Sequence, residues 1–594
     1  MSPQRLLSLA ALAVLALAPL VVSEFSVTLL NYIGLASLVA IGCSLLTGVG
    51  GLTSFGQAAF VGLGAYTTAV LTTQFGWSPW LTLPAGLALT TAVAMLLAVI
   101  TLRLSGHFLP VGTIAWGISL YYLFANVDGL GGQTGITGVP PLQIGEHVVN
   151  TGREFYYLVW IFVVLALVAM RNLLDSRPGR AIRALRGGVM MAESCGVDTQ
   201  HYRAVIFLVS ALLACLSGWL YAHLIRFVNP SPFSINLSIE YLFMAVIGGA
   251  SHVWGAVVGA TVLTVLKQWL QDILPRLIHA SGNFETIVFG LLMVLLLQRA
   301  RTGIMPFLSR FLPLEQPVAV PDLEPSKVEP EATLASRPKP AAGEPLLEVR
   351  QAVRRFGGLV AVNRISFEMR AGEILGLIGP NGAGKSTMFN LITGVLAPSA
   401  GEVWLRGERV DHLRSRQIAQ RGVARTFQHV QLRPGMSVIE NVAIGAHLRA
   451  SGGVMGAALR LDRAAERSML REARVQLERV GLGAELLAPA GSLPLGSQRI
   501  LEVARALAAD PMLLLLDEPA AGLRYQEKRA LADLLVRLRG EGVSILLVEH
   551  DMDFVMNLVD RLVVMQFGEQ IATGLPHEIQ ANPAVIEAYL GGVE

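Results

Sequence analysis

Apolar runs long enough to cross a bilayer recur through the first 300 positions of this chain, separated by short polar segments. We expect helices near residues 5–22, 27–48, 57–73, 79–104, 107–126, 156–173, 204–224, 238–273 (room for two short spans) and 284–298. Residues 1–310 are therefore predicted to form an α-helical polytopic membrane domain of about eight to ten transmembrane helices. The first run could also be a signal peptide, but we expect an uncleaved span because further spans follow.

The pattern changes in the second half. ILGLI (374–378), MLLLLD (512–517) and VSILLV (543–548) are short apolar runs of the type found in buried strands, and residues 346–356 show strand-like alternation. Residues 346–594 are therefore predicted to form a soluble α/β domain. Between the two halves, residues 311–345 are rich in Pro, Ala and acidic residues without periodicity, which predicts an extended, semi-rigid linker.

Charge and composition support this division. Only 15% of the 594 residues are charged, and residues 1–310 hold 25 charged residues against 64 in the remainder. The net charge of +3 is too small to favour nucleic-acid binding. Cys43, Cys195 and Cys215 have no spacing suited to a disulfide framework or a metal site, so we expect small apolar side chains.

The loops predict the orientation of the membrane half. The segment 171–203 carries six arginines, whereas the loop 127–154 carries one arginine against three acidic residues. By the positive-inside rule the first segment is cytoplasmic and the second external. The end of the membrane half, with Arg299, Arg301 and Arg310, is also expected on the cytoplasmic side.

Glycine-rich stretches in the membrane half leave some interpretations open. Gly255 and Gly259 form a GxxxG pair that predicts close helix packing. The polar, Gly-rich segment 48–66 is suited either to packing or to lining a transport pathway, because polar backbone within a membrane must be buried or face a cavity. The segment 129–140 is a loop by composition, and a plain connection is favoured over an external gate.

The most specific motif of the chain is GPNGAGKST, from Gly379 to Thr387. It follows the apolar run 374–378 and fits GxxxxGK[ST], whose backbone N–H groups cradle phosphates. Lys385 is expected to reach the β- and γ-phosphates and Ser386 to coordinate Mg²⁺, while the helix that follows adds positive potential. This stretch predicts nucleotide binding.

Two later segments complete a hydrolytic site. Asp517 ends an apolar run and can hold Mg²⁺ through water, and Glu518 can polarise the attacking water. His550 follows another apolar run and could contact the γ-phosphate, although a single histidine there is more often structural. Gln428, within RTFQHVQL, has no specific signal of its own.

Taken in order, these motifs resemble the ATP-binding subunits of ABC transporters. VEHDMDFVMNLVDRLVVM and ANPAVIEAYLG resemble more narrowly LivG, the first ATPase of the branched-chain amino-acid uptake systems. In the first half, LTGVGGLTSFGQAAFVGLGAYTTAVL, GQTGITGVP, SRPGRAIRALR and MAVIGGASHVWGAVVGA are similar to the permease LivM. The resemblance covers nearly the whole chain except the linker and implies a fusion of permease and ATPase.

The resemblance implies roles for individual residues. Phe356 would stack on adenine, Glu518 would be the catalytic base and His550 would orient the γ-phosphate, with Lys385 and Gln428 completing the catalytic set. The residues implied in ATP binding are Phe356, Gly379, Asn381, Gly382, Gly384, Lys385, Ser386 and Thr387, and those implied in Mg²⁺ binding are Ser386, Gln428 and Asp517. The cytoplasmic stretch AESCG, with Ala192, Glu193 and Gly196, resembles the coupling helix that contacts the ATPase; a plain amphipathic surface helix is the alternative.

Two motifs depart from the family pattern. The signature LSGGQ, which completes the ATP site of a partner ATPase, reads LPLGS here, with Leu493, Gly496 and Ser497 in the motif. Pro494 offers neither a hydroxyl nor an N–H group. Arg524 also stands where Asn or Asp is common. We therefore predict that the ATP site built on this chain's phosphate loop is competent and that the site completed by LPLGS is slower.

The resemblance implies an ATP-dependent importer component in a bacterial inner membrane, with its ATPase cytoplasmic. The implied partners are a LivH-like permease, a LivF-like ATPase and a periplasmic substrate-binding protein, and the implied substrate is a branched-chain amino acid or a related small solute. A homodimeric ABC exporter and a non-transporting regulatory assembly are the alternatives. The sequence does not identify the solute.

Overall fold

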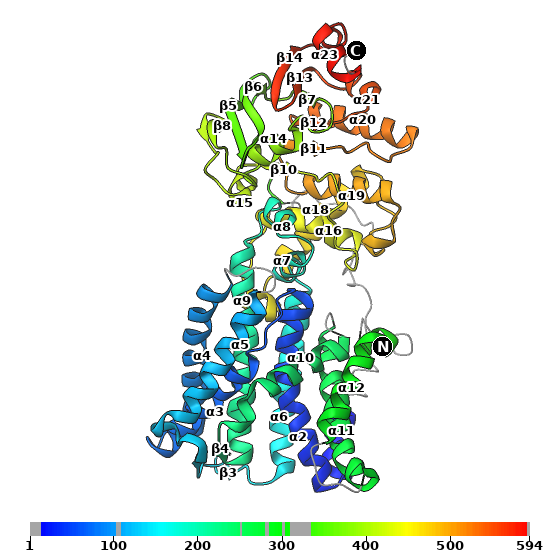
Figure 1. The fold of residues 1–594 in the computed structure, drawn as a ribbon. Coiled ribbons are helices and arrows are strands. Elements are labelled where there is room, and N and C mark those ends of the chain that lie inside the picture. The colour runs from blue at the N-terminus through cyan, green and yellow to red at the C-terminus, as the bar shows by residue number, and fades with distance from the viewer. Residues whose placement is uncertain are drawn as a thin grey trace. The chain divides into compact units, whose positions relative to one another are not determined.

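The computed structural model describes residues 13–102, 108–249, 252–278, 284–299, 303–308 and 334–590. The chain divides into two compact units (Figure 1). Met1–Leu174 with Gln200–Gln316 form the membrane unit, and Asp175–Thr199 with Pro317–Glu594 form the ATPase unit. The segment 175–199, here called the docking segment, therefore belongs to the ATPase unit although its sequence lies between two helices of the membrane unit.

The membrane unit is helical, as predicted. Its helices are α2 (Glu24–Cys43), α3 (Gln57–Thr73), α4 (Pro79–Thr101), α5 (Phe108–Asn126), α6 (Gly152–Leu174), α9 (Thr199–Ile225), α10 (Ile235–Gly249), α11 (Val253–Ile278), α12 (Phe284–Arg299) and α13 (Met305–Leu308). Within the described residues, six helical stretches are long and apolar enough to span a membrane, starting at Glu24, Pro79, Phe108, Gly152, Thr199 and Val253. The helices α3, α10 and α12 lie where further spans were predicted, but they are shorter than these six. The total of eight to ten spans stays a prediction. Residues 13–21 are also helical, and the start of the first predicted run lies outside the described residues.

Small residues bring the helices of this unit close together. A Cβ on Gly64 of α3 would lie 2.1 Å from the carbonyl oxygen of Cys215 in α9, and one on Gly218 would lie 1.8 Å from that of Val61. Gly255 and Gly259 of α11 approach the backbone of α10 in the same way. The predicted packing role of the GxxxG pair is thus confirmed. Cys43, Cys195 and Cys215 are buried free cysteines, also as expected.

The Gly-rich stretch interrupts a helix. A π-helical turn, η1 (Ser44–Val49), ends α2, and regular helix resumes only at Gln57. Side-chain hydroxyls satisfy backbone N–H groups around the break. Thr113 Oγ1 accepts from Phe55 N at 3.0 Å, and Ser238 Oγ accepts at 3.0 Å from Ala58 N in the first turn of α3. The break is largely buried, which suits both packing and a pathway. A role of this segment in transport stays a prediction.

The predicted loop between α5 and α6 contains only short elements. These are the 3₁₀ turns η2 (Asp128–Leu130) and η3 (Gly132–Thr134) and the strands β1 (Ile136–Thr137), β2 (Gln143–Ile144) and β3 (His147–Val148). β1 pairs with β4 (Phe227–Val228) of the connection between α9 and α10, which includes the turn η4 (Ser231–Phe233). The loop between α5 and α6 is therefore hydrogen-bonded to the connection between α9 and α10 of the same unit.

Two sheets form the core of the ATPase unit. The larger sheet has the order β10-β11-β12-β7-β13-β14, in which all neighbours are parallel except β13 and β14. Its strands are β7 (Ile374–Ile378), β10 (Val423–Arg425), β11 (Leu513–Asp517), β12 (Ser544–Val548), β13 (Arg561–Gln566) and β14 (Glu569–Gly574). The smaller antiparallel sheet joins β5 (Pro345–Phe356), β6 (Leu359–Arg370), β8 (Ala400–Leu405) and β9 (Glu408–Arg409). The predicted strands at 374–378, 512–517 and 543–548 are confirmed.

Helices complete the unit. They are α7 (Arg177–Leu185) and α8 (Val189–Ser194) of the docking segment, followed by α14 (Lys385–Ile392), α15 (Ser415–Gln420), α16 (Val438–Gly445), η6 (Ala446–Arg449), α17 (Val454–Ala458), α18 (Arg463–Arg479), η7 (Ala490–Ser492), α19 (Leu495–Leu507), α20 (Tyr525–Gly540), α21 (Met552–Met556), α22 (Pro576–Gln580) and α23 (Pro583–Leu590). α16, α18 and α19 share an apolar core of their own, which includes Val442, Leu477 and Leu501. This helical subdomain carries the ion-pair partners of α7 described below, whereas α8 packs against α15.

The described end of the predicted linker lies along the ATPase unit. Arg449 Nη2 donates to the carbonyl oxygens of Leu334 at 3.0 Å and Ala335 at 3.3 Å. Lys339 pairs with Asp510 at 3.6 Å. The stretch before β5 is therefore held in place by side chains of the cassette.

Candidate nucleotide site and docking segment

Four parallel strands place the candidate catalytic residues side by side. The adjacent strands β10, β11, β12 and β7 all run in one direction, so their carboxyl ends meet at one edge of the sheet. β10 leads to Gln428, β11 ends at Asp517 and Glu518, β12 leads to His550, and β7 leads into the phosphate loop. Residues up to 171 positions apart in the sequence are thus gathered by topology alone, at the usual ligand-binding edge of such sheets.

The phosphate loop has backbone conformations that require glycine at several positions. Gly382 and Gly384 have φ of +83° and +97°, and a Cβ on Gly384 would lie 2.3 Å from the carbonyl oxygen of Ala361. Nothing lies within 4 Å of a Cβ built on Gly382, so the loop is open there. Lys385 Nζ bonds the loop carbonyls of Gly379 at 2.7 Å and Pro380 at 3.0 Å. The loop is therefore shaped to receive phosphate oxygens.

Glu518 is held from several sides. Its carboxylate accepts from Gln428 Nε2 at 2.9 Å and contacts His550 Nε2 at 2.9 Å. Its carbonyl accepts from Arg499 Nη1 at 2.8 Å, which ties it to the signature helix α19. Glu518 also has a φ of +50°, a conformation that costs free energy in a residue with a side chain. The structure thus brings together Glu518, His550 and Gln428, whose catalytic roles stay a prediction, and adds Arg499, which no motif indicated.

The acidic edge of the site fits a divalent cation. Asp517 is buried, and its Oδ1 has no hydrogen-bond partner among the described residues. Burial raises the pKa of the Asp517 carboxyl, while the positive charge of Arg425 opposes that shift. Burial also lowers the pKa of Lys385, against the negative charges of Glu518 and Asp517. An orphaned carboxylate oxygen beside a phosphate loop is suited to water-mediated Mg²⁺ binding.

The remaining predicted nucleotide residues lie around this edge. Ser386 and Thr387 are in the first turn of α14, and Asn381 is in the loop before it. Phe356 ends β5 and is 43% exposed, with the Arg354 guanidinium 4.7 Å from the centre of its ring. The exposed ring is available for stacking on a base if Arg354 moves aside.

The signature residues lie at the start of α19. Pro494 is the N-cap of this helix, and its side chain makes no capping hydrogen bond. Leu493 is buried, whereas Leu495 is 58% exposed. Gly496 lies against the side chains of Leu523, just before α20, and of Glu527 in the first turn of that helix. Ser497 follows in the first turn of α19, so the predicted signature residues form one helix start.

The docking segment packs on the cassette through small residues. Ala192 of α8 is fully buried. Gly196 has a φ of +82°, and a Cβ there would lie 2.2 to 2.6 Å from three atoms of Leu448. Glu193 accepts from Thr199 Oγ1 at 2.7 Å, so it stabilises the segment itself. The predicted coupling residues are therefore next to the ATPase, although their role in coupling stays a prediction.

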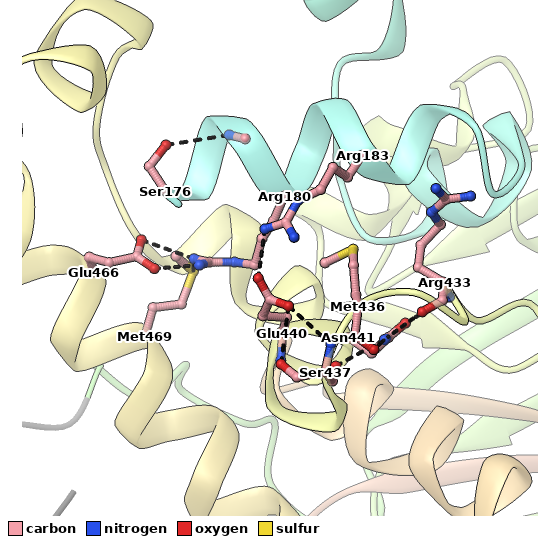
Figure 2. A network of polar contacts seen from close by, with 11 residues as sticks. Ser176, Arg180, Arg183, Arg433, Met436, Ser437, Glu440, Asn441, Glu466 and Met469 are labelled. Atoms are coloured by element: carbon pink, nitrogen blue, oxygen red, sulfur yellow. Dashed lines mark hydrogen bonds and ion pairs between the residues drawn. The ribbon is translucent and has the colours of Figure 1, made fainter. Parts of the chain in front are cut away.

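Arginines of α7 make contacts that the sequence did not predict (Figure 2). Arg180 pairs with Glu466 of α18, and Arg183 Nη2 donates to Glu440 Oε1 of α16 at 2.7 Å. Arg177 Nε donates to the carbonyl oxygen of His447 at 2.8 Å. From the sequence these arginines indicated only a cytoplasmic loop. Their spacing of three residues places them along one helix face, which is the signal that could have been used.

His447, under the docking segment, gives this interface a pH dependence. Burial, together with the charges of Arg177, Arg180 and Arg416, lowers the pKa of His447 to about 3. In the unfolded chain a histidine titrates near pH 6.5. Between these two pKa values the unfolded state binds more protons than the folded state. The contribution of His447 to the free energy of unfolding is therefore fully present above about pH 6.5 and is lost as the pH falls. At pH 5 we expect a loss of about 2 kcal/mol.

Hydrogen exchange in peptides covering residues 438–452 of the full chain measures this loss, after correction for intrinsic exchange rates. His447→Gln is expected to remove the pH dependence, whereas His412→Gln, which changes an exposed histidine of the same unit, should preserve it. An equal pH slope in wild type and His447→Gln would contradict the assignment.

Comparisons with known proteins cover both halves of the chain. A family model described as a permease component of branched-chain amino acid transport systems matches residues 25–297. An ABC transporter model matches residues 362–521, and a model of branched-chain amino acid ATP-binding cassette transporters matches residues 569–594.

Individual relatives match the ATPase half. The high-affinity branched-chain amino acid transport ATP-binding protein LivG of Salmonella typhimurium is 46% identical over 42% of this chain and 98% of its own length. LivG of Escherichia coli is 45% identical over the same shares. The fructose import ATP-binding protein FrcA of Rhizobium meliloti is 33% identical over 43% of this chain and 96% of its own length. A solved nucleotide-free ATP-binding cassette is 30% identical over 42% of this chain and 99% of its own, with a TM-score of 0.38.

The matches and the six candidate spans agree on a membrane transporter with a cytoplasmic ATPase. The ATPase half is matched by LivG over nearly the whole length of that protein, and the permease model extends across the helical half. The chain therefore belongs to the branched-chain amino acid ABC transporters, and it carries a permease component and an ATP-binding component of that family in one polypeptide.

Proposed function

We propose that this chain is the fused subunit of an importer that carries a branched-chain amino acid, or a related small solute, across a bacterial inner membrane. One observation carries the proposal. The docking segment, which connects α6 and α9 of the membrane unit, is packed into the ATPase unit that holds the nucleotide site. A movement of the helical subdomain can therefore be transmitted to α6 and α9, because the docking segment is covalently connected to both helices.

The residues of the nucleotide site divide the chemistry among them. The N–H groups of the loop from Gly379 to Thr387 and the Lys385 ammonium hold the phosphates of ATP, and Phe356 stacks on adenine. Glu518 takes the proton of the attacking water, and His550 positions the γ-phosphate. Ser386, Gln428 and Asp517 would hold Mg²⁺, which neutralises charge on the phosphates.

A second ATPase completes the assembly. Leu495 and Tyr525 are 58% and 80% exposed, and they lie at the starts of α19 and α20, which meet at Gly496. Exposed apolar groups gathered beside the signature support a partner surface there. A LivF-like ATPase and a LivH-like permease fit these needs. Because Pro494 lacks an N–H group, the ATP site that this signature completes should be the slower of the two.

The substrate class rests on the relatives. The names of the LivG proteins state high-affinity branched-chain amino acid transport, and that of FrcA states fructose import. A periplasmic binding protein would deliver the solute. Leucine is therefore the first probe to use, with a sugar as the alternative.

The test is the ATPase rate of the complex in membranes. We expect a leucine-loaded binding protein to stimulate hydrolysis, and we expect a separate permease chain to co-purify with this one. Purification as a homodimer without other permease chains would favour the exporter reading. Hydrolysis that no loaded binding protein stimulates would favour the regulatory reading.

A further inference from the structure

The charged face of α7 is built into the ATPase unit and is not a solvated surface. The Arg180 side chain is 4% exposed and that of Glu466 15%. Both terminal nitrogens of Arg180 contact the Glu466 carboxylate, and Nη2 also lies 3.7 Å from Met469 Sδ. This two-pronged contact fixes the orientation of the guanidinium as well as its position.

The second pair uses a carboxylate that the ATPase also holds through a helix cap. Glu440 is 6% exposed at the side chain, and its Oε2 accepts from Ser437 N at 3.0 Å as part of the capping box of α16. Its Oε1 is left for Arg183 Nη2 at 2.7 Å (Figure 2). The Arg183 charge also lowers the pKa of Glu440 against the effect of burial. A carboxylate already fixed by a helix cap loses little freedom when the arginine arrives.

The other docking contacts select less strongly between partner ATPases. Ala192 of α8 and the following Cys195 and Gly196 are buried small residues. Arg177 donates to backbone carbonyl oxygens of His447 and Gly452, which any cassette backbone can offer. Asp198 pairs with Arg416, but their side chains are 34% and 40% exposed, and exposed ion pairs contribute little. An ATPase that lacked acidic residues at the positions of Glu440 and Glu466 would bury the Arg180 guanidinium without a partner. Such a burial weakens binding by about 100-fold or more.

We propose that Arg180 and Arg183 form a recognition code that assigns this ATPase half to its own permease half and rejects a second ATPase without both carboxylates. The code rests on the proposed assembly, in which two different ATPases compete for two permeases. The linker keeps the ATPase half nearby, and the arginines decide which cassette occupies the docking segment.

The first experiment removes the tether from the full chain. A protease site placed within residues 316–333 allows cleavage after assembly, and a tag on the membrane half then reports how much ATPase half remains bound. Arg180→Glu and Glu466→Arg should each weaken retention about 100-fold or more. The double exchange Arg180→Glu with Glu466→Arg should restore most of it. Arg467→Glu, at an exposed neighbour in α18, is the matched control and should retain the ATPase half like wild type.

The second experiment separates choice from attachment. Arg180→Met with Arg183→Met removes the charges that a second ATPase would leave unpaired, and it leaves Glu440 and Glu466 of this chain's own ATPase half without their partners. The docking segment should therefore accept the second ATPase, and the ratio should shift toward it. The ratio of the two ATPases bound to the tagged membrane half measures this. An unchanged ratio would overturn the code, as would full retention by Arg180→Glu.

The outcomes also separate this code from the proposed function. If wild type brings down no second ATPase, the proposed partners are wrong, and retention after cleavage alone judges the two ion pairs. If the second ATPase is present and the ratio does not respond to the arginines, the assembly stands and the code is wrong.

Discussion

Replacing Glu518 by glutamine is expected to lower the ATPase rate of the assembled complex by about 100-fold or more. Glutamine keeps the size of the side chain but cannot accept the proton of the attacking water. The loss should be nearly complete for the whole complex because the other ATP site, completed by Pro494 and Ser497, is expected to turn over slowly. Phosphate release at saturating ATP measures the effect.

Two controls show whether the loss is specific to Glu518. Glu485→Gln makes the same change at an exposed position of the helical subdomain and should hydrolyse ATP like wild type. Binding of a fluorescent ATP analogue should persist in Glu518→Gln, since the phosphate loop is intact. If most of the hydrolysis survived in Glu518→Gln, the predicted inequality of the two sites would be wrong.

Replacing Gly196 by valine is expected to reduce solute uptake about tenfold or more while ATP hydrolysis loses its stimulation by the binding protein. The φ of +82° is costly for valine, and its Cβ would overlap Leu448, at 2.2 Å. Both effects weaken the binding of the docking segment to the cassette. About 1.4 kcal/mol in the docking equilibrium corresponds to a factor of ten.

Gly481 provides the matched control for Gly196. Its φ is also +82°, but nothing lies within 4 Å of a Cβ built there. Gly481→Val therefore carries the same backbone cost without the overlap, and uptake should stay near the wild-type rate. Adding Leu448→Ala to a Gly196→Ala chain should recover part of the uptake. Equal losses in Gly196→Val and Gly481→Val would show that backbone strain, and not the contact with Leu448, is responsible.

Local motifs made part of this structure predictable. The apolar run 374–378 became β7 with the same bounds, because a strand buried on both faces needs continuous apolar residues. The glycines of the phosphate loop are specified by positive φ angles, so the motif alone indicates its backbone. The family resemblance then supplied Gln428, which has no local signal of its own, and it favoured a γ-phosphate contact for His550, for which a structural role was otherwise the commoner interpretation.

Contacts between distant segments were not predictable in this way. Arg180 and Glu466 are 286 residues apart, and Arg499 reaches Glu518 through the packing of α19. Arginines next to a membrane helix are already explained by the positive-inside rule. Their sequence position therefore did not indicate a second role in docking. The stretch from 334 to 345 had the composition of a linker, yet backbone carbonyls at its start are bonded by Arg449. The composition of a segment indicates how flexible it would be in isolation. It does not indicate which side chains of the folded domain will bind the segment.

The most direct test of the account is leucine uptake into proteoliposomes that contain this chain with its permease and ATPase partners. ATP is supplied on the side of the ATPase unit and leucine-loaded binding protein on the opposite side. The account predicts that leucine accumulates on the ATP side in wild type and does not accumulate in Lys385→Ala. ATP-driven movement of leucine toward the binding-protein side, or hydrolysis by the full complex without any movement of leucine, would contradict it.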